Sequence, residues 1–372
     1  MQRFYIVIWV IVVTLYGNIS AFATHPDGYY PGAVAPPPPP VSAYAPVPHI
    51  ALMLPLQSSA FGSAAETVKE GFVTAAKREP AIPLTIRVYS TTDDPLDILI
   101  TYHQALDAGA VLIVGPLTRN GVTALASSHV VEVPTLALNT TDMNMMLPSN
   151  LYLFGLQMES EANYIADMAL STHKNHAIII KDSSRLSVRL QTAFADRWLS
   201  EYGNTAESVE YDEQQAFFSR LRKYTGGGQN LVFLALDADK VRRIRSYLNP
   251  VTPVYATSQI FVTNQDPLFN HDLNGIQFVD MPWLLQPDHP AVMTYRGSDN
   301  MENRDKDSER LYALGIDAFR LMRHMLQVRS PYDIEFDGVT GHIRFAAPAH
   351  FIRKPVAAVI DKGKVQLLEK SQ

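Results

Sequence analysis

The segment VLIVGPLTRNGV, residues 111–122, runs from an apolar strand into a Gly-Pro turn and then a short polar run. The side chains of Thr118, Arg119 and Asn120 could do chemistry there. Thr118 has no base nearby in the sequence, so it is a poor nucleophile. One glycine and no lysine are too few to cradle a phosphate. Two interpretations remain: Thr118 begins a helix, or the segment lines a binding cleft.

The cleft interpretation depends on the geometry of parallel sheets, whose ligands bind beyond the carboxyl ends of the strands. Three loops that follow predicted strands would share such a rim. The candidate ligand-binding residues are Gln57, Pro116, Leu117, Thr118, Asn139 and Thr140, with Ser258 after a later strand. Arg119 would lie near a helix N-terminus, which disfavours a cation. We therefore expect Arg119 to pair with an acid of the chain or of a partner.

The motifs of several enzyme classes are missing from the sequence. It has no G-x-G-x-x-G that opens a helix, no P-loop and no G-x-S-x-G elbow. His173 and His176 lack the spacing that places two imidazoles on one metal. Asp93 and Asp94 precede Pro95, which favours a role as helix caps. We expect no catalytic residues, no metal and no cofactor.

The composition is that of a globular protein with sizeable cores. The chain has 372 residues, of which 47% are hydrophobic and 18% are charged. That length allows two domains. A net charge of −6 without a long basic run argues against nucleic-acid binding. The absence of cysteine excludes disulfides, thiolate metal sites and a cysteine nucleophile.

Residues 1–23 are typical of a secretory signal peptide. Arg3 precedes an apolar run, and Ala21-Phe22-Ala23 forms an A-x-A cleavage site. The run is too short to span a membrane comfortably, which takes roughly 20 residues. Residues 24–48 form a proline-rich linker that favours polyproline II. We expect the protein in the periplasm.

From residue 49 onward, apolar strands alternate with amphipathic helices. Strands are predicted at 49–56, 84–90, 110–115 and 133–139, then at 176–181, 230–236, 252–258 and 275–285. Helices are predicted at 65–79, 93–109, 159–173, 187–203, 237–249 and 309–327. Two hairpins follow at 336–345 and 357–368. This order predicts two consecutive α/β units with parallel sheets.

Eight segments of the sequence, taken together and in their order, indicate a family resemblance. They are IALMLPLQSSAFGSAAETVKEGFVTA, VYSTTDDP, AGAVLIVGPLTRNGVTALA, VPTLALN, VYATS, GIQFVDMPWLL, LYALGIDAFRLM and FDGVTGHIRF. Their ordered combination resembles the C-terminal domain of the penicillin-binding-protein activators, the LpoA/LppC-type lipoproteins. The resemblance covers roughly residues 49–368.

The resemblance implies a two-lobed α/β fold like that of the type I periplasmic binding proteins. Each lobe would be a mainly parallel sheet flanked by helices, and three strands would cross between the lobes near 151–156, 279–284 and 334–338. The first lobe would comprise 49–153 and 284–330, and the second lobe 154–283 and 331–372.

The resemblance also implies a role: to bind and stimulate a bifunctional penicillin-binding protein, a peptidoglycan synthase. The sequence has no cysteine for a lipid anchor, and a proline-rich linker stands where the family has a helical-repeat region. We therefore expect membrane contact only through an uncleaved signal segment. Trp283 and Arg119 are candidate partner-binding residues. Trp283 either anchors an exposed apolar patch or is packed at a hinge between the lobes.

Two functions from different classes remain open. The first is a non-enzymatic regulator of peptidoglycan synthesis. The second is a solute receptor that holds an amino acid or small peptide between the lobes and feeds an ABC transporter. Such a receptor needs donors for a carboxylate, for which Thr118, Asn139, Thr140 and Ser258 are candidates. It also needs an acid for the ammonium group, for which the candidates are Asp182, Asp266 and Asp280.

Overall fold

The structure is a computed structural model that describes residues 46–142, 145–202, 204–261, 267–296 and 304–368. These described residues form one compact unit. The predicted signal peptide and the predicted linker up to residue 45 lie outside the described residues.

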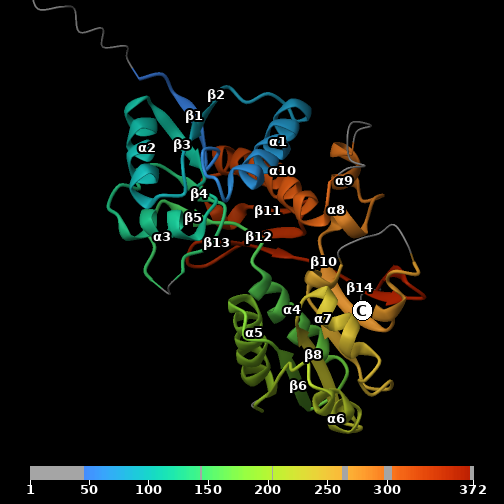
Figure 1. Cartoon of the computed structure of the whole chain (residues 1–372). Coiled ribbons are helices and arrows are strands. Elements are labelled where there is room, and N and C mark those ends of the chain that lie inside the picture. The colour runs from blue at the N-terminus through green and yellow to red at the C-terminus, as the bar shows by residue number, and fades with distance from the viewer. Residues whose placement is uncertain (1–45, 143–144, 203, 262–266, 297–303, 369–372) are drawn as a thin grey trace, which may run out of the picture. The chain divides into compact units, whose positions relative to one another are not determined.

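The first sheet has the strand order β11-β12-β13-β5-β4-β3-β1-β2 (Figure 1). Its pairs are parallel from β2 through to β13, and β11, β12 and β13 pair antiparallel. The strands are β1 (His49–Leu54), β2 (Thr85–Ser90), β3 (Ala110–Val114), β4 (Thr135–Ala137), β5 (Leu151–Leu153), β11 (Glu335–Asp337), β12 (His342–Ala346) and β13 (His350–Lys354). Every residue of β1 is buried, because helices cover both faces of the sheet.

Two pairs of helices provide this cover. Ile50 and Leu52 pack with α1 (Gly62–Arg78) and α10 (Lys306–Gln327) on one face. Ala51 and Met53 pack with α2 (Pro95–Asp107) and α3 (Arg119–Ser127) on the other face, as the alternation of side chains along a strand requires. The short helices α8 (Pro282–Leu285) and α9 (Pro290–Tyr295) contact α10 and α1 respectively.

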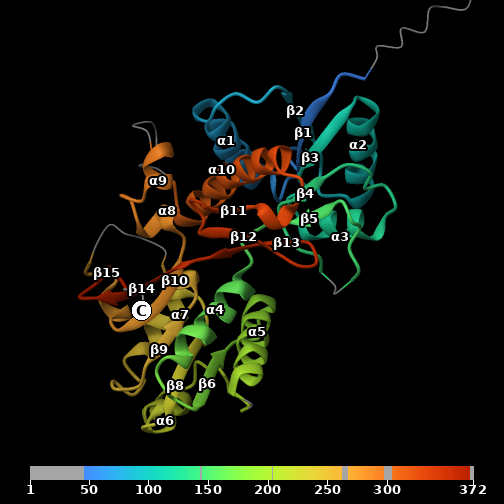
Figure 2. The ribbon, with the colours of Figure 1, turned by 180° about the vertical axis from the view of Figure 1, so that it is seen from behind.

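The second sheet has the order β15-β14-β10-β9-β8-β6-β7 (Figure 2). Strands β7, β6, β8, β9 and β10 pair in parallel, and β10, β14 and β15 pair antiparallel. The strands are β6 (His176–Lys181), β7 (Glu207–Glu210), β8 (Asn230–Ala235), β9 (Val254–Ala256), β10 (Ile276–Asp280), β14 (Val356–Asp361) and β15 (Lys364–Leu367).

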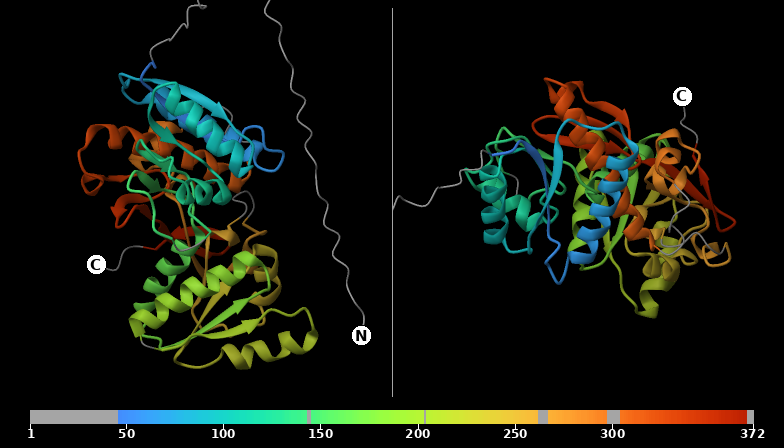
Figure 3. Two further views of the ribbon diagram at one scale, coloured as in Figure 1. Left: turned by 90° about the vertical axis from the view of Figure 1, so that its left-hand side faces the viewer. Right: turned by 90° about the horizontal axis from the view of Figure 1, so that it is seen from above.

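Helices also cover both faces of this sheet. On one face, α4 (Met158–Leu170) and α5 (Arg185–Tyr202) form a separate apolar cluster with β6 and β8 (Figure 3). Helices α6 (Gln215–Thr225) and α7 (Ala238–Arg245) pack on the opposite face. Short 3-10 turns lie at η1 (Ser258–Ile260), η2 (His271–Leu273) and η4 (Pro331–Asp333). The prediction of a two-sheet α/β fold is confirmed. Below, the first lobe means the first sheet with its helices, and the second lobe means the second sheet with its helices.

The chain passes between the lobes after β5, after β10 and after β13. The assignment of residues 331–372 to the second lobe is wrong for its first half, because β11, β12 and β13 belong to the first sheet. Strand β13 pairs with β5 at His350 and Leu153, so the third crossing falls at 354–356 and not at 334–338. The sequence predicts a hairpin from its turn residues, but those residues do not specify which sheet the hairpin joins.

Helices α1 and α10 approach each other at two glycines. A Cβ atom built on Gly71 would lie 2.0 Å from the carbonyl oxygen of Tyr312, and one on Gly315 would lie 2.0 Å from that of Val68. Only glycine permits such a close approach of two backbones. This contact fixes α10 against α1 and so positions the residues that α10 contributes to the site.

Candidate functional site

The loops that follow β3 and β4 are bonded to each other. The backbone N–H of Leu138 donates to the carbonyl of Pro116, and the side-chain amide of Asn139 donates to the carbonyl of Leu117, each at 2.9 Å. The hydroxyl of Thr118 accepts from a backbone N–H in the first turn of α3, so the prediction that Thr118 begins a helix is confirmed. The structure thus brings these predicted rim residues together, and their polar groups bond within the fold.

The other predicted rim residues are more dispersed. Gln57 is exposed, and its backbone N–H donates to the carbonyl of Thr91 at 2.9 Å. Thr140 is half-buried and follows Asn139 in the loop after β4, where its backbone N–H donates to the side chain of Asn139. Ser258 is buried after β9 in the second lobe. That the seven residues line one cleft therefore stays a prediction.

Arg119 pairs with an acid of the chain, which confirms one of the two predicted options. Its Nη2 lies 2.9 Å from Oε1 of Glu159, and Nε of Arg189 lies 2.9 Å from the same oxygen. Arg119 begins α3 in the first lobe, whereas Glu159 and Arg189 lie on α4 and α5 in the second lobe. This ion pair therefore links the two lobes.

A buried group of charges also lies where the lobes meet. We call it the junction cluster and define it as Glu161, Ser258, Asp280, Arg310 and Arg353. Oε1 of Glu161 lies 3.1 Å from Nη2 of Arg353, and Oε2 accepts from the backbone N–H of Ser258 at 3.0 Å. Glu161 comes from α4 and Arg353 from β13, so this pair also joins the second lobe to the first.

Arg310 forms the second ion pair of the junction cluster. Its Nη2 lies 2.6 Å from Oδ2 of Asp280 and also donates to the carbonyls of Ser258 and Phe261. The Asp280 side chain is 1% exposed and that of Arg310 is 11% exposed. In this pair, in Glu161–Arg353 and in Arg119–Glu159, the cation belongs to the first lobe and the acid to the second.

The electrostatics of the junction cluster follow from its burial. Burial raises the pKa of Glu161, which the nearby charge of Arg353 opposes and that of Asp280 reinforces. Burial lowers the pKa of Arg310, but the Asp280 carboxylate outweighs burial and raises that pKa above its usual value. Arg310 is therefore always charged, and its charge is matched inside the protein.

Three acids were predicted as partners for an ammonium group, and the two that the structure describes are both paired within the chain. Asp280 is bound by Arg310, and Asp182 lies 2.5 Å from Nζ of Lys240. The third candidate, Asp266, lies outside the described residues. Among the four side chains predicted to receive a carboxylate, the Thr118 hydroxyl accepts a backbone N–H and the Asn139 amide donates to a carbonyl. Thr140 is half-buried and Ser258 is buried.

A pocket of about 260 Å³ lies on the first lobe, where β5 approaches β13. Ligand pockets usually have roughly 300–1,000 Å³. Thr140 is the predicted rim residue in its wall, which is formed by Thr140, Thr141, Asp142, Met145, Leu147, Leu153 and His350. Burial lowers the pKa of His350, so its imidazole is neutral at pH 7. This pocket does not include the junction cluster.

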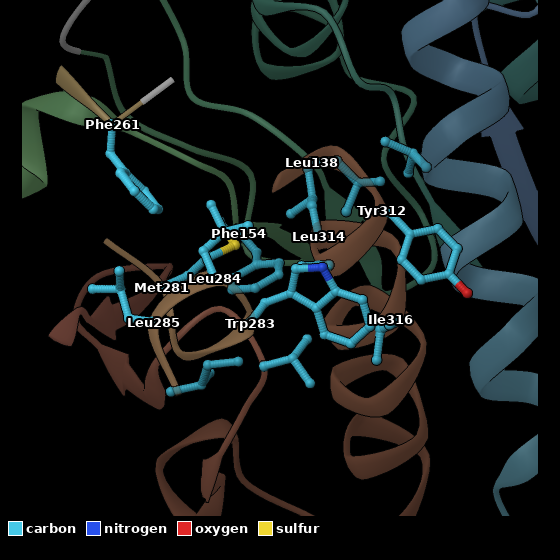
Figure 4. Packing of buried hydrophobic residues seen from close by; sticks show 14 of the residues in the cluster. Leu138, Phe154, Phe261, Met281, Trp283, Leu284, Leu285, Tyr312, Leu314 and Ile316 are labelled. Atoms are coloured by element: carbon cyan, nitrogen blue, oxygen red, sulfur yellow. The ribbon is translucent and has the colours of Figure 1, made fainter. Parts of the chain in front are cut away.

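Trp283 does not anchor an exposed patch, because its side chain is fully buried. Figure 4 shows it within a group of apolar side chains that includes Tyr312 and Met281. Its indole N–H donates to Oε2 of Glu309 at 2.5 Å, and its ring centroid lies 5.6 Å from that of Tyr312. The prediction that Trp283 anchors an exposed patch is therefore wrong, because the side chain packs against α10. An apolar run such as MPWLL reads alike from sequence whether it faces solvent or covers a helix.

Sequence reasoning did not identify Glu161, Arg310 and Arg353 as a group. A signal was present, since Arg353 interrupts the apolar alternation of β13, and its side chain is buried. A buried charge in a strand needs a partner. The sequence could not name that partner, because Glu161 lies 192 positions away.

The described residues contain no cluster of three or more histidine or acidic side chains arranged to hold a metal ion. The same residues include no helix with the length and apolar character needed to cross a membrane.

The sequence matches the family described as "LppC putative lipoprotein" over residues 43–224 and 219–354. These ranges include strands and helices of both lobes. The chain belongs to the LppC family. The resemblance drawn from the eight sequence segments is thereby confirmed.

Curated relatives of this LppC-family chain match most of its length. "Penicillin-binding protein activator LpoA" of Glaesserella parasuis is 27% identical over 299 residues, which are 78% of this chain and 50% of the relative. The protein of the same name from Pasteurella multocida is 27% identical over 82% of this chain and 52% of the relative. The chain therefore spans about half the length of these curated relatives.

Solved structures share the fold. A protein of Chromobacterium violaceum described as a "putative branched-chain amino acid ABC transporter" is 34% identical, with a TM-score of 0.71, over 84% of this chain and 99% of its own. The LpoA C-domain of Haemophilus influenzae, described as a regulator of PBP1A, is 23% identical, with a TM-score of 0.73, over 86% of this chain and 100% of its own. The latter likeness establishes the fold alone.

Proposed function

We propose that this chain is a non-enzymatic periplasmic protein that binds a bifunctional penicillin-binding protein and regulates its peptidoglycan synthesis. The observation that carries the proposal is the match across both lobes to a family whose curated relatives are named penicillin-binding protein activators. The proposed location follows from the signal-like residues 1–23.

The geometry of the junction cluster favours a regulator that binds another protein over a receptor that binds a solute between the lobes. Arg310 and Asp280, and likewise Arg353 and Glu161, neutralise each other where the lobes meet. Separating such a buried pair would leave uncompensated charges, which is strongly unfavourable. A protein that acts through its outer surface has no need to open this junction.

One observation favours a second candidate, a receptor for a branched-chain amino acid. It is the 34% identity with the Chromobacterium violaceum structure described as a putative transporter of such amino acids. A receptor must offer its ligand an acid, and the two described candidates, Asp280 and Asp182, are both paired within the chain.

A capture experiment tests the main proposal. The chain from residue 24 onward is immobilised and exposed to detergent-solubilised envelope of the native cell. The control bait is a type I periplasmic binding protein of the same organism, because it has the same fold class without the family assignment. Selective recovery of a bifunctional penicillin-binding protein supports the proposal. The purified synthase should then form glycan crosslinks faster when the chain is added.

A ligand screen tests the second candidate independently. A free amino acid at 100 times its dissociation constant should stabilise the fold by about 2.7 kcal/mol, which is visible as a thermal shift. A shift with leucine, isoleucine or valine, together with no captured synthase, would replace the main proposal by the receptor. If none of the amino acids shifts the melting temperature, the proposal of an amino-acid receptor is wrong.

A further inference from the structure

Helices α6 and α7 meet along a seam of two arginines and two aromatic rings. Arg222 of α6 donates through Nη2 to the carbonyl of Ser246, 3.2 Å away at the end of α7. The rings of Phe218 and Tyr247 lie 5.0 Å apart, and Arg243 of α7 is four residues before Tyr247 in the sequence. The side chain of Arg243 is 60% exposed. The seam therefore presents guanidinium groups beside partly exposed aromatic rings.

The two helices concentrate positive charge in an acidic chain. Helix α6 has three cations and no acid, and α7 has four cations and one acid, so together they carry +6. Since the whole chain carries −6, everything outside these helices carries −12. The sequence has no long basic run, because these cations belong to two separate short helices. We call the cations of the two helices the α6–α7 face, which comprises Arg220, Arg222, Lys223, Lys240, Arg242, Arg243 and Arg245.

Most cations of the α6–α7 face lack an acidic partner. Within the described ranges, ion pairs with acids occur at Lys240, with Asp182 and Asp237, and at Arg243, with the exposed Glu213. Three of the arginines instead donate to backbone carbonyls: Arg222 to Ser246, Arg242 to Phe269 and Arg245 to Asn274. Arg220 donates within its own helix, and Lys223 is exposed. The face therefore keeps charge available for an anion.

We propose that the α6–α7 face binds a flexible acidic segment of a partner protein. Guanidinium groups match carboxylates in a bidentate fork, and arginine with tyrosine is enriched at the centres of protein interfaces. A flexible acidic segment can bind along this face without approaching the rest of the chain, whose net charge of −12 would repel it. A rigid nucleic-acid duplex or a flat anionic bilayer would bring its own charge against that acidic remainder. The inference holds whichever protein is the partner.

The test measures binding of a fluorescent oligoglutamate peptide to the full chain at low and physiological ionic strength. The variant combines Arg220→Gln, Lys223→Gln and Arg243→Gln, which leaves the three arginines that donate to loop and helix-end carbonyls in place. The control combines Lys77→Gln, Arg87→Gln and Arg185→Gln, which removes the same charge from exposed positions elsewhere. A DNA duplex and vesicles containing phosphatidylglycerol are measured alongside.

We expect the variant to bind oligoglutamate about tenfold more weakly and the control to change by less than about twofold, since only the variant removes charge from the α6–α7 face. Unfolding curves of both must match that of the unaltered chain. Equal losses in variant and control would overturn the inference. So would the absence of oligoglutamate binding by the unaltered chain, or tighter binding of the duplex or of the vesicles.

Discussion

Glu161 of α4 and Arg353 of β13 form an ion pair with 3.1 Å between Oε1 and Nη2, and their side chains are 4% and 5% exposed. The pair joins a helix that covers the second sheet to a strand of the first sheet. Apolar packing does not specify the relative position of two surfaces as closely as a hydrogen-bonded charge pair does. We therefore regard this pair as a determinant of how the lobes meet.

Arg353→Met should strongly destabilise the protein. The substitution leaves the Glu161 carboxyl buried without its cation, and loss of one partner of a buried pair costs about 3–5 kcal/mol. The free energy of unfolding from urea titration at pH 7 measures this loss. The double variant Arg353→Met with Glu161→Gln should recover most of it, because the unpaired charge is gone. A single variant as stable as the unaltered chain would contradict the assignment.

The loss of stability in Arg353→Met should depend on pH. Burial already raises the pKa of Glu161, and removal of the Arg353 charge would raise it further. A folded-state pKa above the unfolded value means that the folded protein binds the proton more tightly, so stability falls as the pH rises through that window. Arg353→Met should thus be less destabilised relative to the unaltered chain at pH 5 than at pH 7. An equal difference at both pH values would show that Glu161 does not titrate.

Gly315→Ala should destabilise the protein although alanine is the better helix former by about 1 kcal/mol. The new methyl group would lie 2.0 Å from the carbonyl oxygen of Val68, which is backbone and cannot rotate away. Overpacking of this kind costs about 1–3 kcal/mol. Gly228→Ala is the matched control, because nothing lies within 4 Å of its added Cβ. A gain in the melting temperature of Gly315→Ala would refute the close approach of α1 and α10.

The elements of this fold were predictable where a local signal exists. Asp94 caps α2 and Thr118 caps α3, as their positions before the helical periodicity indicate. The strands β1, β6 and β8 follow apolar runs that are buried on two faces, whereas the largely exposed β7 had no such signal. The hairpins also follow their turn residues, with Lys362 and Gly363 in the left-handed region between β14 and β15.

The parts that could not be predicted depend on contacts between distant segments. The pairing of β13 with β5 is one such contact, since nothing in HFIRK names its neighbour. The junction cluster is another, because Arg310 and Asp280 become partners only when α10 packs beside the end of β10. The sequence could not decide between an exposed and a packed Trp283 for the same reason, since its burial depends on Glu309 and Tyr312.

Trp283→Ala should act on stability. The substitution empties a fully buried site in the first lobe, and such changes cost about 3–5 kcal/mol. Trp283→Phe keeps most of the apolar volume but removes the N–H that Glu309 accepts, and it should cost about 1–3 kcal/mol. Tyr332→Ala is the control, because its side chain is 67% exposed and the loss should be small. Urea unfolding that ranks the alanine variant above the phenylalanine variant in stability would contradict this account.

Asp182→Asn should remove a contribution to stability that depends on pH. Burial raises the pKa of Asp182, but hydrogen bonds from Lys240 and Ser184 outweigh burial and lower that pKa to about 2. A folded-state pKa below the unfolded value stabilises the fold above the unfolded pKa, and that contribution disappears as the pH falls through the folded pKa. We expect the variant to lose about 2 kcal/mol at pH 7.

The difference between the unaltered chain and Asp182→Asn should shrink as the pH falls from about 4 towards 2, since protonation of Asp182 then removes the same charge that the variant lacks. Urea unfolding at a series of pH values measures this convergence. Asp196→Asn, an exposed position in the middle of α5, serves as the control and should track the unaltered chain at every pH. A difference that stays constant down to pH 3 would mean that Lys240 does not hold Asp182 in its charged form, and that a neutral hydrogen bond accounts for the effect.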